Sequence, residues 1–258
     1  MKVAERHKKI LTLIKWQPCT IDVLAITLAV SPVEVRRDLS RLVEQGLLTR
    51  TLGGAAPSAD RTERSLKQRA RFAKEEKRRI AQAAATHVRP KQTLFLDSGT
   101  SAGALADEIA EQAQSLPGLT IVTASLSVAS KLCEVTPIRL ILLGGELRRL
   151  SKGMLGPLAE RTLEGLTFDI AFLSGDALSP IHGIGETGPS QTRLKELVML
   201  KSTHTIALGH AGKLNRTNTH HWAAMPIGTI IITDVKGAHM AEVFQQNGNT
   251  LVSVLPQH

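Results

Sequence analysis

The stretch SPVEVRRDLSRLVE, residues 31–44, combines the signals of a helix start with those of an amphipathic helix. Ser31 can cap the helix, Pro32 suits its first position, and Glu34 can return the reciprocal bond of a capping box. Three apolar residues recur at helical spacing and are expected to pack inward: Val35, Leu39 and Leu42. The stretch therefore predicts a capped helix with one buried face.

The opposite face of this helix is polar and basic. It carries Val33, Glu34, Arg36, Arg37, Ser40 and Arg41. Arginine can contact a DNA phosphate or bind guanine through two hydrogen bonds in the major groove, and the sequence leaves open which arginine does which. Because exposed arginines on a single helix are usually only solvated, the interpretation as a DNA-reading helix depends on the neighbouring elements.

Those neighbouring elements complete a winged helix-turn-helix. Residues 5–16 have the apolar pattern of a helix that Pro18 should end; the apolar residues are Ile10, Leu11, Leu13 and Ile14. Thr20 can cap a second helix, whose apolar stripe is Ile21, Leu24, Ala25 and Leu28. After a break at residues 45–46, residues 47–55 predict two short strands that form a wing around Arg50. We expect this domain to span residues 1–56.

The net charge of the chain is concentrated near its N-terminus. Residues 1–92 hold 20 Lys/Arg and 9 Asp/Glu, a net charge of +11, whereas residues 93–258 hold 12 and 14, a net charge of −2. Neutralised phosphates supply most of the sequence-independent affinity for nucleic acid. A basic module attached to a nearly neutral body therefore indicates that the N-terminal part binds nucleic acid.

The remaining composition is that of an ordinary globular protein. The apolar runs are much shorter than the roughly 18 residues that a membrane span requires, and the first residues lack the pattern of a signal peptide. We expect a cytoplasmic protein that does not enter a membrane. The two cysteines, Cys19 and Cys133, are far apart and are expected to be buried thiols.

Residues 57–74 are polar and basic and have no sustained apolar period. Their cationic residues include Arg61, Arg64, Lys67, Arg69 and Arg71. This composition predicts an interdomain linker. A solvated connector and a segment that adds contacts to DNA phosphates remain equally open interpretations.

Residues 75–258 change to an alternation of helices and short buried strands. The segments expected to be strands are 93–97, 119–123, 139–143, 168–174, 203–208 and 229–233. Most of them are separated by helical patterns, for example 76–87 and 102–112. This order predicts a larger, doubly wound and mostly parallel α/β domain.

Ligands of such domains bind at the carboxyl ends of the strands. Residues 98–101 form a Gly/Ser/Thr turn between a strand and a helix, where backbone N–H groups can hold a phosphate. Such a turn is a weak signal by itself, but small polar residues and a lysine follow the other strands too. The residues expected to form a sugar-phosphate site are Asp97, Ser98, Gly99, Thr100, Ser101, Thr123, Gly144, Gly145, Asp176 and Lys213.

Metal binding is not indicated. His210, His220 and His221 have no carboxylate or cysteine partner at a recognisable ligand spacing. We expect these histidines at the surface or at the rim of a pocket. No cofactor is expected.

Two sets of residues resemble one known family. Residues 30–39 (VSPVEVRRDL), with Leu42, 46–48 (GLL), Arg50 and 53–55 (GGA), resemble the DNA-binding signature of DeoR-type repressors. A second set of segments resembles the sensor domain of the same family: 76–77 (EK), 96–100 (LDSGT), 122–123 (VT), 144–146 (GGE), 168–172 (FDIAF) and 233–234 (TD). The sequence departs from the family pattern at residues 17–19, Leu52, Ser101, Ala124 and His210.

The resemblance implies a sensor domain similar in fold to ribose-5-phosphate isomerases. It also implies a phosphosugar pocket at residues 98–101, with Asp176 and either Lys195 or Lys213 nearby. The departures at Ala124 and His210 concern this pocket, so the identity of the effector stays open.

The expected function is a sequence-specific transcriptional regulator, namely a repressor of a carbohydrate-utilisation operon controlled by a phosphorylated sugar. It would bind a double-stranded DNA operator as a homodimer or homotetramer. The residues expected to contact DNA are Thr20, Ser31, Val33, Glu34, Arg36, Arg37, Ser40, Arg41 and Arg50.

Two other functions compete with this one. The first is a sugar-phosphate isomerase-like enzyme that carries a DNA-binding module, with Asp97 or Asp176 as its base, although no acid/base spacing in the sequence demands catalysis. The second is an RNA-binding or architectural protein. With five Phe, two Trp and no Tyr, the chain offers little for stacking on bases.

Overall fold

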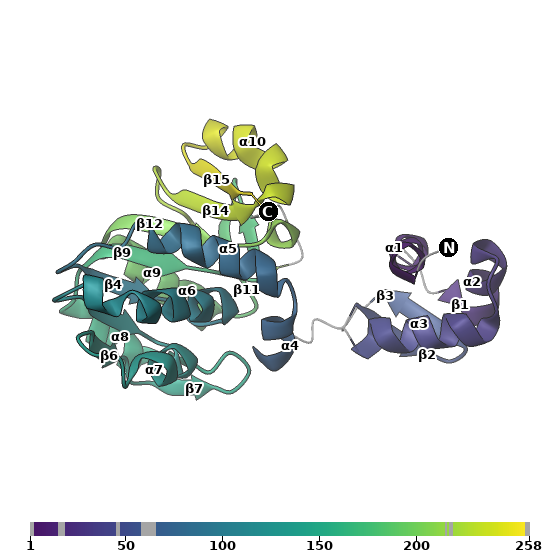
Figure 1. The fold of residues 1–258 in the computed structure, drawn as a ribbon, viewed down its shortest axis with the longest axis horizontal. Coiled ribbons are helices and arrows are strands. Elements are labelled where there is room, and N and C mark those ends of the chain that lie inside the picture. The colour runs from purple at the N-terminus through teal and green to yellow at the C-terminus, as the bar shows by residue number, and fades with distance from the viewer. Residues whose placement is uncertain are drawn as a thin grey trace. The chain divides into compact units, whose positions relative to one another are not determined.

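The computed structural model describes residues 3–14, 19–44, 47–57, 66–214, 216 and 219–255. The chain divides into two compact units, Met1–Arg64 and Ser65–His258 (Figure 1). Within the described residues, no helix combines the length and the hydropathy needed to cross a lipid bilayer. The predicted helix end at Pro18, the break at residues 45–46 and the linker residues Arg61 and Arg64 lie outside the described residues.

The first unit is a winged helix-turn-helix. Its elements are α1 (Val3–Leu13), β1 (Cys19–Thr20), α2 (Ile21–Leu28), α3 (Pro32–Glu44), β2 (Leu48–Thr51) and β3 (Gly54–Pro57). The two wing strands pair antiparallel, and β1 joins them to give the order β1-β3-β2 (Figure 1). The predicted three helices and wing are therefore confirmed, with β1 as an additional short strand.

Local hydrogen bonds explain where these helices start. The Thr20 hydroxyl accepts from the backbone N–H of Val23 at 3.3 Å. At the start of α3, Ser31 Oγ accepts from the Glu34 N–H at 3.3 Å, and Glu34 Oε2 accepts from the Ser31 N–H at 3.1 Å. These two reciprocal bonds are the capping box expected from the sequence.

The core of the first unit is formed by the predicted apolar faces. Its largest fully buried side chains are Ile10, Ile14, Leu24, Val35, Leu39 and Leu42. One expectation was wrong: Leu13 is 38% exposed. Ile10 and Ile14 are four residues apart and share the inward face of the chain at this point, so Leu13 is directed away from it.

The second unit contains a seven-stranded parallel sheet in the order β15-β14-β12-β9-β4-β5-β6. The strands are β4 (Thr93–Leu96), β5 (Thr120–Thr123), β6 (Arg139–Leu142), β9 (Phe168–Leu173), β12 (Ser202–Leu208), β14 (Ile230–Asp234) and β15 (Thr250–Val254). Six of them match predicted strands. The edge strand β15 was not predicted, because its burial alternates only weakly.

Helices cover both faces of this sheet. The helices are α5 (Lys74–Ala85), α6 (Thr100–Glu111), α7 (Leu126–Leu132), α8 (Pro157–Glu164), α9 (Pro189–Leu200) and α10 (Ala241–Gln246). One core cluster joins the sheet to α5, α6 and α7, and the other joins it to α8, α9 and α10 (Figure 1). This arrangement confirms the predicted doubly wound fold.

Two small antiparallel sheets lie outside the main sheet and were not predicted. One is the hairpin of β7 (Glu146–Arg148) and β8 (Gly153–Leu155). The other contains β10 (Ala177–Ser179), β11 (Gly183–Glu186) and β13 (His221–Ala223). Three 3₁₀ segments, Ala113–Ser115, Ala211–Lys213 and Val235–Met240, complete the described elements.

Two further expectations need correction. The predicted linker includes a helix, α4 (Leu66–Arg71), which packs against α6 and belongs to the second unit. Cys133 is exposed and Cys19 only half-buried, so they are not two buried thiols. Cys133 directly follows α7, whose inward side is already formed by Val128, Ala129 and Leu132.

Candidate functional site

The outward face of α3 is the candidate DNA-reading surface. Val33 is 62% exposed, and Arg36, Arg37 and Arg41 are also exposed. From β2, Arg50 Nη2 donates to Ser40 Oγ at 2.7 Å and to the Arg36 carbonyl oxygen at 3.4 Å. The wing arginine is thus tied to the middle of α3 and lies beside Arg36.

Three predicted DNA-contacting residues also have structural roles. Thr20, Ser31 and Glu34 form the helix caps described above. Glu34 also lies 3.6 Å from Nη1 of Arg6 in α1. All three remain exposed, so the same side chains can still face DNA.

A buried ion pair that the sequence reasoning missed connects α1 to α3. Asp38 is only 1% exposed; it accepts from Nε of Arg6 and from Nε2 of His7, the latter at 2.9 Å. Burial opposes ionisation of Asp38, but the bonds from Arg6 and His7 outweigh it and hold the pKa of this carboxyl below its ordinary value. The signal was available, because Asp38 occupies an inward position three residues after Val35.

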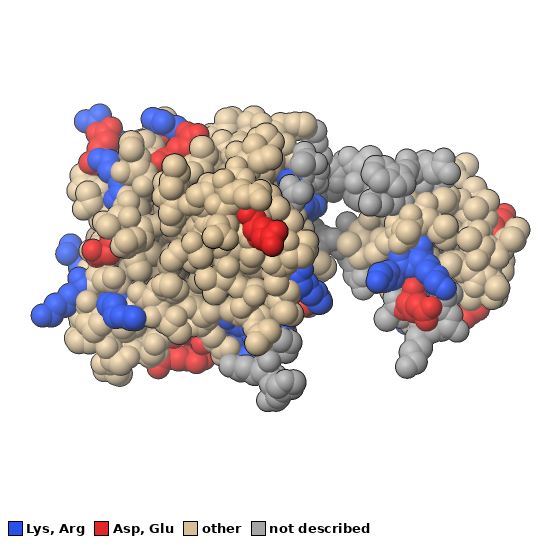
Figure 2. Space-filling model, turned by 90° about the horizontal axis from the view of Figure 1, so that it is seen from above, with Lys and Arg blue, Asp and Glu red and all other residues tan. Residues whose placement is uncertain are grey.

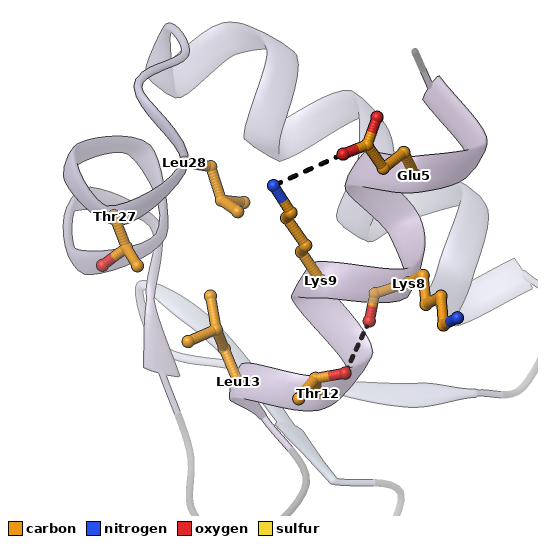
Figure 3. A pocket seen from close by; sticks show the side chains of 7 residues that line it. All are labelled: Glu5, Lys8, Lys9, Thr12, Leu13, Thr27 and Leu28. Atoms are coloured by element: carbon orange, nitrogen blue, oxygen red, sulfur yellow. Dashed lines mark hydrogen bonds and ion pairs between the residues drawn. The ribbon is translucent and has the colours of Figure 1, made fainter. Parts of the chain in front are cut away.

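A hollow of about 450 Å³ lies between α1 and α2 (Figure 3). Leu13 and Leu28 are apolar residues of its lining, and Lys9 pairs with Glu5, one turn earlier in α1, at 3.4 Å. None of the residues predicted to bind an effector lines it. Basic and acidic side chains lie beside one another on the face of the first unit that Figure 2 shows.

The second candidate site lies at the carboxyl ends of the parallel strands. Asp97 follows β4 and is buried; its Oδ2 accepts from the Ser174 N–H at 2.9 Å and from Nζ of Lys195 at 2.5 Å. Lys195, from α9, is also 3.1 Å from Glu186 Oε1 on β11. Three buried charged groups from three elements therefore meet here.

Ionisation within this triad is strongly coupled. Burial penalises the charge on Lys195, but Asp97 and Glu186 reverse that effect and raise its pKa, so the ammonium stays charged. Burial raises the pKa of Glu186 despite the nearby Lys195. Gln191 Nε2 donates to the second oxygen of Glu186 at 2.6 Å. The buried triad of Asp97, Glu186 and Lys195 is thus a structural part of the site. Because two donors of the Lys195 ammonium are already used, it has few left for a ligand.

A second charged group lies at the ends of β9 and β12. Asp176 Oδ1 is 3.6 Å from Arg69 Nη1 of α4, and its buried Oδ2 has no hydrogen-bond partner among the described residues. Lys213 donates to the Gly175 carbonyl oxygen at 2.5 Å. Burial lowers the pKa of Lys213, although Asp176 acts in the opposite direction. An anion placed here would therefore stabilise the charged lysine.

Residues 98–101 form the predicted strand-to-helix turn. Gly99 has φ of +117°, a conformation that favours glycine, and no side chain caps the helix that starts at Thr100. Ser174 Oγ would lie 3.6 Å from a Cβ at Gly99, so the turn adjoins the end of β9. Ser101 is 2% exposed, and its Oγ has no hydrogen-bond partner among the described residues. Backbone donors and spare hydroxyl capacity are therefore concentrated at this turn.

The remaining predicted effector residues lie at the ends of β5 and β6 and offer the site no free side-chain donor. Thr123 is fully buried, and its hydroxyl already donates to the Leu96 carbonyl oxygen at 2.6 Å. Gly144 is exposed after the edge strand β6. Gly145 has φ of +136°, and a Cβ there would lie 2.6 Å from the Leu155 carbonyl oxygen, which explains the glycine structurally.

His210 is buried rather than superficial. Its Nδ1 accepts from the Gly212 N–H at 3.1 Å, and its ring meets that of Phe72 at a centroid distance of 5.4 Å. His220 is exposed and His221 half-buried. In the described part of the chain, no cluster of His, Cys, Asp and Glu has the geometry of a metal site.

The two units together define a class of protein, a DNA-binding regulator with an attached α/β ligand domain. Comparison with protein families matches residues 6–60 to the DeoR-like helix-turn-helix domain and residues 73–235 to the DeoR C-terminal sensor domain. The chain belongs to the DeoR family of transcriptional regulators.

Full-length relatives agree with this assignment. The chain is 31% identical to the HTH-type transcriptional regulator GlpR of Haloferax volcanii, over 98% of each chain. It is 30% identical to the glycerol-3-phosphate regulon repressor of Escherichia coli K12, over 91% of this chain and 92% of that one. The prediction of a DNA-binding regulator is confirmed over the enzyme alternative.

Solved structures add a distant likeness. The ribose 5-phosphate isomerase A of Methanocaldococcus jannaschii matches 55% of each chain with 16% identity and a TM-score of 0.42. A likeness at this level bears on neither the activity nor the ligand of the present chain.

Proposed function

We propose that this chain is a repressor of a carbohydrate-utilisation operon and that a phosphorylated sugar or polyol controls its binding to the operator. The observation that carries the proposal is the group of buried charges at the carboxyl edge of the sheet, next to the uncapped first turn of α6. A relative that matches 91% of this chain is named the glycerol-3-phosphate regulon repressor, so a regulon for a phosphorylated polyol is controlled by a protein of this family.

The phosphate would bind at the first turn of α6. Backbone N–H groups at a helix start favour an anion, and Thr100 and Ser101 can add hydroxyl donors. Lys213 would supply the balancing charge. In this arrangement Asp97, Lys195 and Ser98 hold the turn in place, since Asp97 accepts from the Ser98 N–H at 2.7 Å as well as from Lys195.

The sugar hydroxyls would be recognised by Asp176. Its Oδ2 is buried and has no partner among the described residues, so a hydroxyl donor would remove the cost of leaving it unsatisfied. Thr123, Gly144 and Gly145 would then shape the site through the backbone rather than contact the effector.

On DNA, α3 would enter the major groove while Arg50 extends the contact from the wing. Arg36, Arg37 and Arg41 are the candidates for phosphate and base contacts, and Val33 for an apolar contact with a thymine methyl group. Thr20, Ser31 and Ser40 would contact the DNA backbone from the caps and the middle of α3. Glu34, which can only accept hydrogen bonds, would face a base amino group such as cytosine N4.

We propose further that the functional form is a homodimer or homotetramer, since paired modules read half-sites about 34 Å apart or multiples of that spacing. A cytoplasmic location fits a DNA-binding protein. The domain limits proposed are 1–56 for the DNA-binding domain, 57–74 for the connection and 75–258 for the sensor. Within the connection, α4 packs with the second unit.

A thermal-shift screen tests the effector class. The full chain is heated with phosphorylated sugars and polyols, each paired with the same compound lacking the phosphate. A site-specific ligand raises the Tm because it binds only the native state. We expect at least one phosphorylated compound to raise the Tm and its unphosphorylated partner to have no effect; equal effects from both would contradict a phosphate site.

A further inference from the structure

Helix α4 is fixed to the carboxyl edge of the sheet by three separate contacts. Arg69 pairs with Asp176 after β9, at 3.6 Å. The Phe72 ring, just after α4, meets the His210 ring edge-on at an interplanar angle of 67°. The Lys77 ammonium in α5 donates to the carbonyl oxygens of Arg69 and Phe72, the latter at 2.5 Å.

The partners of α4 belong to the proposed effector site. Asp176 is the residue proposed to recognise hydroxyl groups, and His210 opens the 3₁₀ segment that contains Lys213. Arg69 and Lys213 repel each other, and both are attracted to Asp176. Asp176 therefore attracts two cations, and one of these cations comes from the segment that leads to the first unit.

The Arg69–Asp176 pair is placed where a ligand can compete with it. The two side chains are 20% and 22% exposed, in contrast with the fully enclosed Lys195–Asp97 pair at 4% and 3%. Guanidinium groups bind phosphate oxygens through two parallel hydrogen bonds, a stronger arrangement than an ion pair at 3.6 Å. An incoming phosphate could therefore replace Asp176 as the partner of Arg69.

We propose that Arg69 is a direct ligand of the effector's anionic group, and that its exchange of Asp176 for that anion shifts α4 and so transmits occupancy of the site towards the DNA-binding unit. This inference rests on the proposed sensing of a phosphorylated compound. α4 starts at Leu66, two residues after the end of the first unit, so a change in its position acts directly on the connection. The effector would favour one of two states of α4 through different contacts in each, as allosteric control requires.

Hydrogen exchange of the full chain without ligand tests the contact that holds α4. Three variants are compared with the wild type: Arg69→Gln, Asp176→Asn and the control Arg71→Gln, which removes the same charge from an exposed position of α4. We expect at least fivefold faster exchange over residues 66–72 in the first two variants and unchanged exchange in the control. Unchanged exchange in all three would overturn the proposal.

Ligand response separates this inference from the proposed function. The probe is glycerol 3-phosphate, together with any phosphorylated sugar that raises the wild-type Tm, and the readout is the change in DNA affinity. We expect the ligand-induced change in DNA affinity to be at least tenfold smaller in Arg69→Gln than in the wild type, and to be unchanged in Arg71→Gln. A full response in Arg69→Gln overturns the role of Arg69 and leaves the proposed function standing. Failure of every probe to bind the wild type rejects the proposed function, and the role of Arg69 with it.

Discussion

Lys195 Nζ lies 2.5 Å from Asp97 Oδ2, although the two residues are 98 positions apart in the chain. The pair joins α9 to the end of β4, an interior strand of the sheet, and orients the turn that starts α6. Because Glu186 shares the same ammonium at 3.1 Å, three buried charges depend on one another. The proposed effector site therefore lies next to a buried ionic triad. The contribution of this triad to the free energy of unfolding can be measured without any ligand.

Lys195→Met should strongly destabilise the second unit. The variant leaves Asp97 and Glu186 buried without their cation, which costs about 3–5 kcal/mol. Urea unfolding followed by Trp222 fluorescence, in a Trp16→Phe background, measures the loss. The control is Arg193→Met on the exposed side of α9, where a surface ion pair contributes about 1 kcal/mol or less. Equal losses of unfolding free energy in both variants would argue against a stabilising role of the triad.

Asp38→Asn should change how the stability of the first unit depends on pH. The unfolded carboxyl titrates at about 3.9, and the folded pKa is lower. The stabilising contribution of Asp38 is therefore fully present above about pH 3.9 and is lost as the pH falls through the folded pKa. Hydrogen exchange of α1 and α3 from pH 6 downwards should show the gap between wild type and variant closing in acid.

The exposed Asp22→Asn serves as the control for the first unit. Because Asp22 lies on the solvent side of α2, its replacement should open a much smaller gap from the wild type than Asp38→Asn does. A gap for Asp38→Asn that stays constant down to pH 3 would contradict the assigned pKa direction.

Arg36→Ala and Arg37→Ala should weaken DNA binding and leave the fold intact. A base-contacting arginine should cost about 1–3 kcal/mol and relax sequence preference, whereas a phosphate-contacting one should reduce the salt slope by about one. Fluorescence anisotropy on DNA selected from a random pool, at several salt concentrations, distinguishes these outcomes. Lys9→Ala removes a charge from α1 and serves for comparison. Unchanged affinity and preference in both arginine variants would remove α3 as the reading helix.

Lys213→Ala and Thr100→Ala should reduce the response to effector by at least about tenfold, within the usual range of allosteric coupling. DNA affinity without effector should stay close to that of the wild type. Lys201→Ala is the matched control, since Lys201 directly precedes β12 and therefore lies at the amino ends of the strands, away from the proposed site. The measurement is the release or retention of DNA when a phosphorylated compound that raises the Tm is titrated into a preformed complex of each variant with DNA. A normal response in both Lys213→Ala and Thr100→Ala would exclude the proposed pocket.

Much of the fold follows from periodic patterns. The capping box at Ser31 and Glu34, the apolar stripe of α3 and six of the seven parallel strands were predicted, because local spacing and burial determine them. The seventh strand, β15, lies at the sheet edge, where weak burial gives little pattern. The small sheets contain strands of three or four residues, too short for periodicity to appear.

The sites depend more heavily on tertiary pairing. Strand ends indicated Asp97, Asp176 and Lys213, because parallel strands bring their carboxyl ends to one edge. Glu186 and Arg69 gave no local signal, since each acquires its role from a partner nine or more positions away. Arg69 belongs to a stretch that is merely basic in sequence, and only its pairing with Asp176 distinguishes it from Arg71.

The most direct test of the central claim is the affinity of the full chain for its selected DNA, with and without a phosphorylated sugar that raises its Tm. We expect steep salt dependence and a change of at least about tenfold in Kd on adding the ligand, with no change for the same sugar lacking its phosphate. A DNA affinity that stays constant under every stabilising phosphorylated ligand would contradict the account.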